Sequence, residues 1–458
     1  MAASPPLFHM NAFDRSVIRQ RERLFPILML TLLWLVTRGI LFACYEPVTY
    51  PDSGAYQRLA HQIITLDFRG YDGQRTPGYP LLLALVAANN FAIWLVQSVL
   101  ALMTALLVYT LLRRAGTSTS WAMLAAVINL LTLNTLFFEP AIMTETVTGF
   151  LLVAVSYLIA SLVTGKARSA NPWLVGLMTA LLILTRSQYI VLIPVFLVLL
   201  WWFVRERRGT TLLIFLLVAS APVLGWAGFN KYQTGYFTIT TLLGYNLSNH
   251  SGAFMERAPD KDAVLRDTYL KHRDREIAET GAHHMTIFDA RQDLLRTTGL
   301  SEIGLSREFQ RISINLFIAY PADYLRSVGK AWLSYWTEPN YWRLDKVRSP
   351  GVSTVVQSLW KVQHLLLRGL NAVFILLTPY VVWRSLTRRD AVSHSMRVAL
   401  VLAANVVSVS VMQALVEFGE NGRYFIPNQP LVLMVVLLVF TKSTVQTSRV
   451  KNDVYQAN

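Results

Sequence analysis

Charged residues are scarce in this sequence. Asp, Glu, Lys and Arg make up 15% of its 458 residues, and 53% of the residues are hydrophobic. A soluble globular chain carries about 25% charged residues. The composition therefore excludes an ordinary soluble domain and predicts an all-α polytopic membrane protein.

Cysteine is almost absent as well. Cys44 is the single cysteine, which excludes an intrachain disulfide and a cysteine metal cluster. The sequence has no P-loop, no Gly-x-Gly-x-x-Gly and no zinc-protease motif, so direct nucleotide binding has no signature. Residues 1–23 are polar, and the apolar run after them has no small-residue cleavage site. We therefore expect the first apolar run to be retained as a membrane span.

Acidic residues are few relative to basic ones. There are 27 of them against 42 Lys and Arg, which gives a net charge of +15. In a soluble protein this excess would suggest nucleic acid. Here the basic residues cluster in short segments between apolar runs, where they set membrane topology. We expect no nucleic-acid partner.

Apolar runs of the length of a membrane-spanning helix follow one another along the chain. Ten of them lie at 24–43, 91–112, 120–138, 143–163, 172–186, 188–204, 210–228, 366–384, 396–416 and 425–441. The fifth and sixth runs meet at Arg186-Ser187-Gln188, which predicts a tight hairpin over 172–204. Residues 80–88 predict a short re-entrant or interfacial helix.

Lysine and arginine are distributed unevenly over the connections between these runs. Alternate connections, starting with 1–23, hold 18 of them, whereas the short connections on the other side hold 5. By the positive-inside rule both termini face the cytoplasm. The segment around Asp52 then faces outward.

Three regions follow from this layout. Residues 1–228 form an N-terminal transmembrane module, with a first external loop at 44–80. Residues 229–352 are a long polar connection in which charged and apolar residues alternate at helical spacing, which predicts an external helical subdomain. Residues 353–458 hold the remaining spans and a cytoplasmic tail.

Asp52 is the central candidate in the first external loop. A helix-compatible run follows it, so one interpretation is an N-cap, for which Asp is a favoured residue. The other is a general base for an acceptor hydroxyl or amine at the edge of the bilayer. The two roles are compatible.

Three outward arginines are candidates for binding phosphate, which a guanidinium holds bidentately. Arg75 opens the turn Arg-Thr-Pro-Gly-Tyr-Pro, Arg186 lies where the fifth and sixth runs meet, and Arg423 lies just before the last run. A plainer interpretation makes Arg75 part of a turn and Arg423 an interfacial anchor.

Two charged residues lie inside apolar runs, namely Arg38 and Glu145. Charged groups at such depth usually face a protein interior or a watery cavity, although snorkelling or an ion pair would also explain them. Carboxylates such as Asp52, Glu139 and Glu145 are of the kind that binds a divalent cation. Their spacing does not establish a metal site, so we expect no cofactor.

Taken in order, these motifs resemble the GT-C superfamily of integral-membrane glycosyltransferases. They are most similar to the bacterial branch with the protein mannosyltransferase-like and lipid A aminoarabinose transferase-like enzymes. The matching residues are Asp52, Tyr56, Arg75, Pro77, Gly78, Tyr79, Pro80, Glu145, Arg423, Tyr424 and Pro427. The resemblance covers residues 1–228 and the last span, and the segment 229–352 has no counterpart in it.

The resemblance implies a reaction, which is inverting transfer of a sugar from a polyprenyl-phosphate donor on the periplasmic face of a bacterial inner membrane. Asp52 would be the base or would orient the acceptor, and Arg75, Arg186 and Arg423 would hold the donor phosphate. The supporting residues would be Arg38, Tyr56, Tyr79, Glu139, Glu145 and Tyr424. The partners would be the donor, membrane lipid and a glycan, lipid or protein acceptor. Several relatives have paired acids in the first loop, whereas Ser53 and Gly54 follow Asp52 here, which argues against a metal-dependent scheme.

Two other functions would use similar lipid-linked substrates. One is a transporter or flippase of a lipid-linked glycan. Transporter folds often show paired halves with broken helices, whereas here the polar residues favour one surface. The other is a glycan polymerase or ligase, which the sequence does not separate from a transferase.

Overall fold

A computed structural model of the protein describes residues 12–165, 171–337, 342–387 and 392–441. Within these residues the chain is helical, and the only β-type pairings are two isolated bridges, Tyr45 with Val347 and Val48 with Ala141. The all-α prediction is confirmed for this part of the chain. The first eleven residues and most of the predicted cytoplasmic tail, 442–458, lie outside the described residues.

Seven helices of the described chain are long and apolar enough to cross a membrane. They are the Leu24–Cys44 part of α1 (Ala12–Cys44), α4 (Asn90–Arg114), α7 (Glu145–Thr164), α10 (Arg208–Thr234), α16 (Pro350–Thr387), α17 (His394–Val416) and the segment Asn421–Thr441, which starts with α18 (Asn421–Phe425). Shorter apolar helices occupy the other predicted runs, namely α5 (Thr119–Leu131), α8 (Pro172–Thr185) and Ser187–Phe203, which contains α9 (Leu192–Phe203). The protein is thus an all-α polytopic membrane protein.

The predicted single run at 120–138 is wrong, because the helix breaks at Thr132. This residue has extended backbone angles, and α6 (Leu133–Phe138) starts after it. Gln363 of α16 fills the gap, since its side chain accepts a hydrogen bond from the Leu133 amide at 2.7 Å and donates to the Leu131 carbonyl at 3.1 Å. A side chain from a distant helix thereby satisfies backbone groups that the break would leave without partners.

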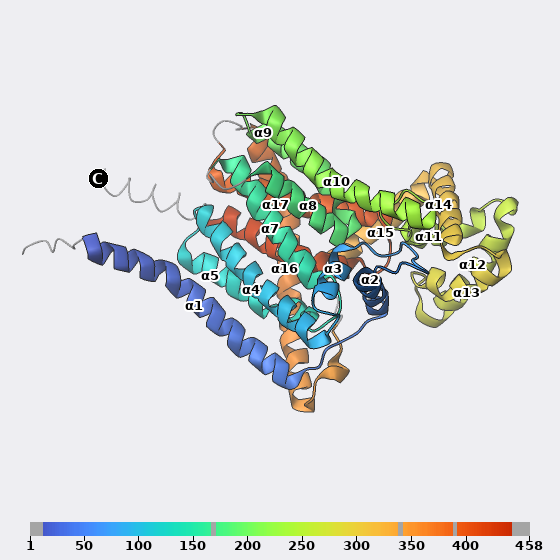
Figure 1. The fold of residues 1–458 in the computed structure, drawn as a ribbon, viewed down its shortest axis with the longest axis horizontal. Helices are drawn as coiled ribbons and strands as arrows, with labels where there is room; N and C mark the ends of the chain where they lie inside the picture. The colour runs from blue at the N-terminus through green and yellow to red at the C-terminus, as the bar shows by residue number, and fades with distance from the viewer. Residues whose placement is uncertain (1–11, 166–170, 338–341, 388–391, 442–458) are drawn as a thin grey trace, which may run out of the picture.

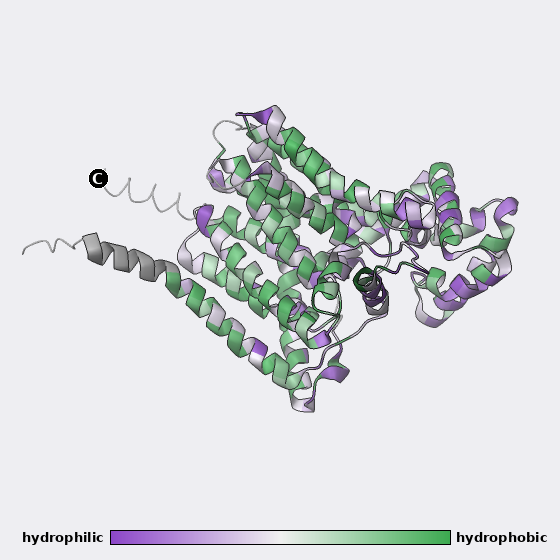
Figure 2. Cartoon of the chain, viewed as in Figure 1, coloured by the Kyte–Doolittle hydropathy of each residue, from purple (hydrophilic) through white to green (hydrophobic). Residues whose placement is uncertain are grey.

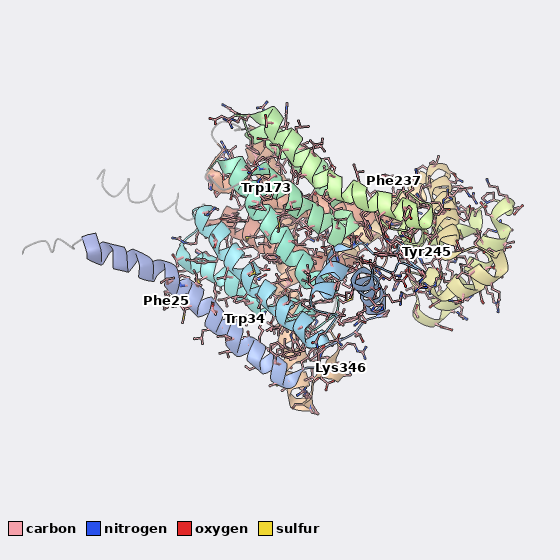
Figure 3. All side chains as sticks on the ribbon, in the orientation of Figure 1. Phe25, Trp34, Trp173, Phe237, Tyr245 and Lys346 are labelled. Atoms are coloured by element: carbon pink, nitrogen blue, oxygen red, sulfur yellow. The ribbon has the colours of Figure 1, made fainter. Side chains whose placement is uncertain are left out.

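The bundle has a buried centre and a lipid-like periphery. In the most apolar part of α7 and of the last helix, 72% of the residues are buried, against 17% in α1. Figure 1 shows α1 along one edge of the bundle, and Figure 2 shows apolar residues along most of its described length. Phe25 and Trp34 lie along this helix in Figure 3. Exposed apolar side chains on a helix with satisfied backbone groups are what a lipid environment requires.

The loop after α1 folds into two short helices, α2 (Ser53–Thr65) and α3 (Gly78–Leu85). The second corresponds to the short helix predicted at 80–88. It packs closely on the end of α8, because a Cβ at Gly78 would lie 2.6 Å from Thr185 Oγ1 and 2.7 Å from the Leu184 carbonyl. Only glycine permits this approach.

Between α10 and α16 the chain forms the predicted helices of the polar connection. They are α11 (Leu243–Ser251), α12 (Ala263–Thr280), α13 (Thr286–Thr298), α14 (Glu302–Ala319) and α15 (Pro321–Tyr335), with short 3₁₀ turns η2 (Gly252–Arg257), η3 (Asp260–Asp262) and η4 (Leu344–Lys346). A separate apolar cluster that includes Tyr245, Tyr269 and Phe309 lies inside this group. In Figure 1 α12, α13 and α14 project from the end of the bundle opposite to the start of α1.

Candidate functional site

Asp52 lies between α1 and α2 in a segment that is anchored to the bundle. The Ser53 hydroxyl accepts a hydrogen bond from the Tyr50 amide and donates to the Ile142 carbonyl, both at 2.8 Å. Asp52 occupies the N-cap position of α2, but its side chain makes no capping hydrogen bond. The N-cap interpretation is therefore wrong for the carboxylate, which points toward two arginines instead.

Asp52 accepts hydrogen bonds from Arg75 at 2.7 Å and from Arg423 at 3.1 Å, one on each carboxylate oxygen. The turn before α3 positions Arg75, and its guanidinium lies 4.8 Å from the centre of the Tyr56 ring. Burial by itself raises the pKa of Asp52, but the two guanidinium groups outweigh it and hold that pKa below its ordinary value. The two arginines therefore stabilise the ionised form of the Asp52 carboxylate.

Glu145, at the start of α7, joins the other two arginines. One of its oxygens accepts a hydrogen bond from Arg186 at 2.6 Å and lies 3.2 Å from Nε of Arg423. Arg186 also donates to the Thr144 hydroxyl at 2.6 Å. The ring of Tyr424 packs under both cations, 5.0 Å from the Arg186 guanidinium and 5.3 Å from that of Arg423. Asp52, Arg423, Glu145 and Arg186 thus form one continuous chain of ion pairs.

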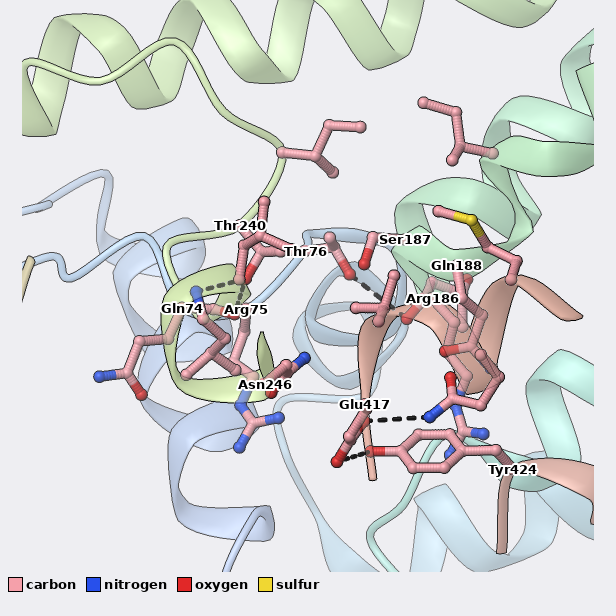
Figure 4. Close-up of a pocket in the computed structure, with 18 of the residues that line it drawn as sticks. Gln74, Arg75, Thr76, Arg186, Ser187, Gln188, Thr240, Asn246, Glu417 and Tyr424 are labelled. Atoms are coloured by element: carbon pink, nitrogen blue, oxygen red, sulfur yellow. Dashed lines mark hydrogen bonds between the residues drawn. The ribbon is translucent and has the colours of Figure 1, made fainter. Parts of the chain in front are cut away.

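Arg75, Arg186, Arg423 and Tyr424 border a cavity of about 250 Å³, which residues of α2, α11 and α17 also line (Figure 4). All three predicted phosphate-binding arginines line it, together with Tyr56 and Tyr424. Its other walls carry polar side chains of Gln74, Thr76, Thr185, Ser187, Gln188, Thr238, Thr240, Asn246, Gln413 and Glu417, and apolar side chains of Ile190, Ile239, Leu242, Leu243, Met412 and Val416. The cavity therefore has a cationic side, amide and hydroxyl groups, and an apolar side.

Several donors at this cavity are buried without a hydrogen-bond partner. Nε of Arg75, Nη1 of Arg186 and Nε2 of Gln188 make no hydrogen bond within the described chain. Buried N–H groups in native proteins are nearly always satisfied. These three donors lie on side chains that line the cavity, where an acceptor oxygen of a ligand or of water would satisfy them after a small side-chain movement.

Glu417 is a residue of this cavity that the predicted site omits. It is the C-cap residue of α17, in a short connection between two spans, and it lines the cavity together with Tyr424. The signal in the sequence was its position, since Glu417 and Glu420 are the outward acids closest to Arg423. Nothing in the sequence separates the two, but only Glu417 lines the cavity.

Three predicted supporting residues lie apart from the cavity. Arg38 and Glu139 form an ion pair buried in the bundle, where the Ser98 hydroxyl also donates to Glu139 at 2.9 Å. Tyr79 is buried beneath Tyr56, with ring centres 5.2 Å apart in an edge-on contact. None of the three lines the cavity. Their contacts are those of structural groups behind the site.

Metal-ligating side chains do not gather in the described part of the chain. No three residues among its His, Cys, Asp and Glu are grouped so that they could hold a metal ion. The carboxylates of Asp52 and Glu145 each bind arginine instead.

Comparisons with models of protein families, with curated proteins and with solved structures each find no match for this chain. The resemblance to membrane glycosyltransferases therefore depends on the motifs and their order along the chain.

Proposed function

We propose that this protein is an inverting membrane glycosyltransferase that takes a sugar from a polyprenyl-phosphate donor. One observation carries the proposal, which is that Arg75, Arg186 and Arg423 come from three distant parts of the chain and line one cavity. Asp52, Glu145 and Glu420 pair with these arginines, and none of the three is among the residues that line the cavity. Glu417 is the carboxylate that lines it. The arginine side of the cavity would bind the anionic part of a ligand.

A phosphate fits this cationic side chemically. Guanidinium groups bind phosphate oxygens through paired, charge-assisted hydrogen bonds. Arg75 and Arg186 both line the cavity, so their guanidinium groups lie next to the space that a phosphate would occupy. When the bond between the sugar and the phosphate breaks, negative charge grows on the phosphate, and fixed cations stabilise that charge in the transition state.

The remaining walls fit the other parts of such a donor. Gln188, Asn246 and Gln74 offer amide groups for sugar hydroxyls. Met412, Val416 and their apolar neighbours offer a surface for an isoprenoid chain. A ligand with an anionic centre, a hydroxyl-rich group and an apolar tail would match all three sides.

The proposed topology is a GT-C-like bundle of ten spans in a bacterial inner membrane, with both termini in the cytoplasm and the cavity on the periplasmic side. The uneven distribution of Lys and Arg supports this orientation. In Figure 1 the described chain begins and ends away from α2 and α3, near which the cavity lies.

In the proposed reaction the acceptor hydroxyl or amine attacks the anomeric carbon from the face opposite to the phosphate and gives its proton to a carboxylate of the site. The bond between that carbon and the phosphate oxygen breaks, its electron pair stays on the oxygen, and polyprenyl phosphate leaves. Asp52 pairs with Arg75 and Arg423 and orients these two donor-binding guanidinium groups.

The test uses purified protein in lipid nanodiscs with polyprenyl-phosphate sugars that carry a labelled sugar. We expect wild-type protein to transfer or release the sugar, and Arg75→Gln to lower this rate by at least tenfold through weaker donor binding. Arg69→Gln is the matched control, because Arg69 lies in the same loop and its ion pair with Asp67 is exposed.

Two outcomes would contradict the transferase. Movement of the intact lipid across a vesicle membrane without cleavage would indicate a flippase. Equal activity of Arg75→Gln and wild type would contradict the proposal that the cavity binds the donor phosphate. The same assay with a chelator measures metal dependence, and we expect no loss of rate.

A further inference from the structure

The cavity has a carboxylate that differs from Asp52 in its surroundings. Glu417 has extended backbone angles at the end of α17 and turns its side chain into the cavity (Figure 4). Asp52 is not among the lining residues. Of the two, Glu417 is the one in direct reach of a ligand in the cavity.

The partners of Glu417 are neutral. Gln413 donates a hydrogen bond to one oxygen at 3.0 Å, and the Tyr424 hydroxyl lies at 3.5 Å from the other. Within the described chain Glu417 forms no ion pair closer than 4 Å, whereas Asp52 forms two and Glu145 forms two. A carboxylate that neutralises arginines is a poor base, because protonating it would break those ion pairs.

We propose that Glu417 is the general base of the transfer, an inference that rests on the proposed glycosyltransferase activity. The carboxylate of Glu417 takes the proton from the acceptor hydroxyl or amine as the acceptor atom bonds to the anomeric carbon. The sugar–phosphate bond breaks at the same time, and its electrons remain on polyprenyl phosphate. Asp52 is then a positioning residue that holds Arg75 and Arg423.

The electrostatic surroundings of Glu417 agree with this role. Burial raises its pKa, the hydrogen bond from Gln413 and the charge of Arg423 lower it less, and the net pKa lies above the ordinary value of a glutamate. A base works best when its pKa is not far below the working pH. The charged and titratable groups around it are Arg423 and Tyr424 on α18, Glu420 just before α18, and His250 on α11. His283 and His284 lie beside Phe418 and Gly419, and Arg75 and Arg186 line the same cavity.

The experiment measures sugar transfer against pH for wild type, Glu417→Gln, Glu417→Asp and Asp52→Asn. We expect the wild-type kcat/KM to rise with pH on the acidic side of the profile. The apparent pKa of this acidic limb should lie above about 4.3, the ordinary pKa of glutamate. Glu417→Gln should lose this limb and about 10²–10⁴-fold in rate. It should still bind the donor with wild-type affinity, because the arginines are intact. Glu417→Asp should keep a limb at lower rate.

Further measurements keep a structural effect apart from a catalytic one. Glu256→Gln is the control, since Glu256 is half-exposed and pairs with Arg273 away from the cavity. Asp52→Asn should lower donor affinity and rate but keep the limb. A Glu417→Gln protein that retains the limb, or transfers within tenfold of wild type, would overturn the assignment. Loss of the limb in Asp52→Asn alone would do the same. Absence of transfer by the wild type would contradict the proposed function itself.

Discussion

Asp52 and Arg423 are hydrogen-bonded at 3.1 Å although 371 residues separate them along the chain. Asp52 belongs to the loop after the first span, and Arg423 opens the last span. This hydrogen bond connects the loop after the first span to the start of the last span, next to the cavity. Arg75, Arg186 and Arg423 therefore come together at the cavity only when the first and last described spans have packed into the bundle.

Replacing Arg423 should have the largest single effect on stability in the site. Arg423→Gln leaves Asp52 with one partner and removes a cation next to the buried Glu145. Breaking a buried ion pair in this way costs about 3–5 kcal/mol. Thermal unfolding in detergent should show a clear fall in midpoint, whereas Arg69→Gln should leave the midpoint unchanged. Equal midpoints would mean that the ion pairs contribute nothing to the fold.

The Asp52 carboxylate should make stability depend on pH only in strongly acidic solution. Its pKa is lowered in the folded protein, so its contribution is complete above the unfolded pKa of about 3.9 and is lost as the pH falls through the folded value. The difference in unfolding midpoint between wild type and Asp52→Asn should be constant from about pH 8 to 5 and shrink below about 4. A difference that changes near pH 6 would contradict this account.

The ion pair of Arg38 and Glu139 should behave as a structural pair. Glu139→Leu leaves a buried guanidinium without its partner and should cost about 3–5 kcal/mol. The double variant Arg38→Met with Glu139→Leu should recover most of this loss, because no buried charge remains. Unfolding midpoints of the two single variants and the double variant measure the coupling. Additive losses, or a change in donor affinity in the double variant, would assign the pair to another role.

The close contact of α3 on α8 should be needed for activity. In Gly78→Ala the new methyl group would meet the Leu184 carbonyl at 2.7 Å, so α3 must move away from α8. Arg75 and Arg186 lie at the ends of these helices, so the shift should lower donor affinity as well as stability. Gly228→Ala in α10 is the control, because no atom lies within 4 Å of its added Cβ. Wild-type donor affinity in Gly78→Ala would contradict the prediction.

The sequence predicts the elements of this fold because lipid imposes one rule on every span. An apolar run must satisfy its own backbone hydrogen bonds, and so it becomes a helix wherever it lies. The run at 120–138 shows the limit of this rule. Its break at Thr132 depends on Gln363, more than two hundred residues further along, and local periodicity carries no trace of that side chain.

For the candidate site too, the sequence predicts some features and only the tertiary structure determines the others. The sequence predicts which residue types lie at the outer ends of the spans, because charged residues next to apolar runs are few. Asp52, Arg75, Arg186 and Arg423 are candidates for this reason. Tertiary structure decided their partners, turning Asp52 away from the helix that it precedes and toward Arg423, and separating Glu417 from Glu420. The physical reason is that a membrane span is specified by its own residues, whereas an ion pair is specified by which spans pack side by side.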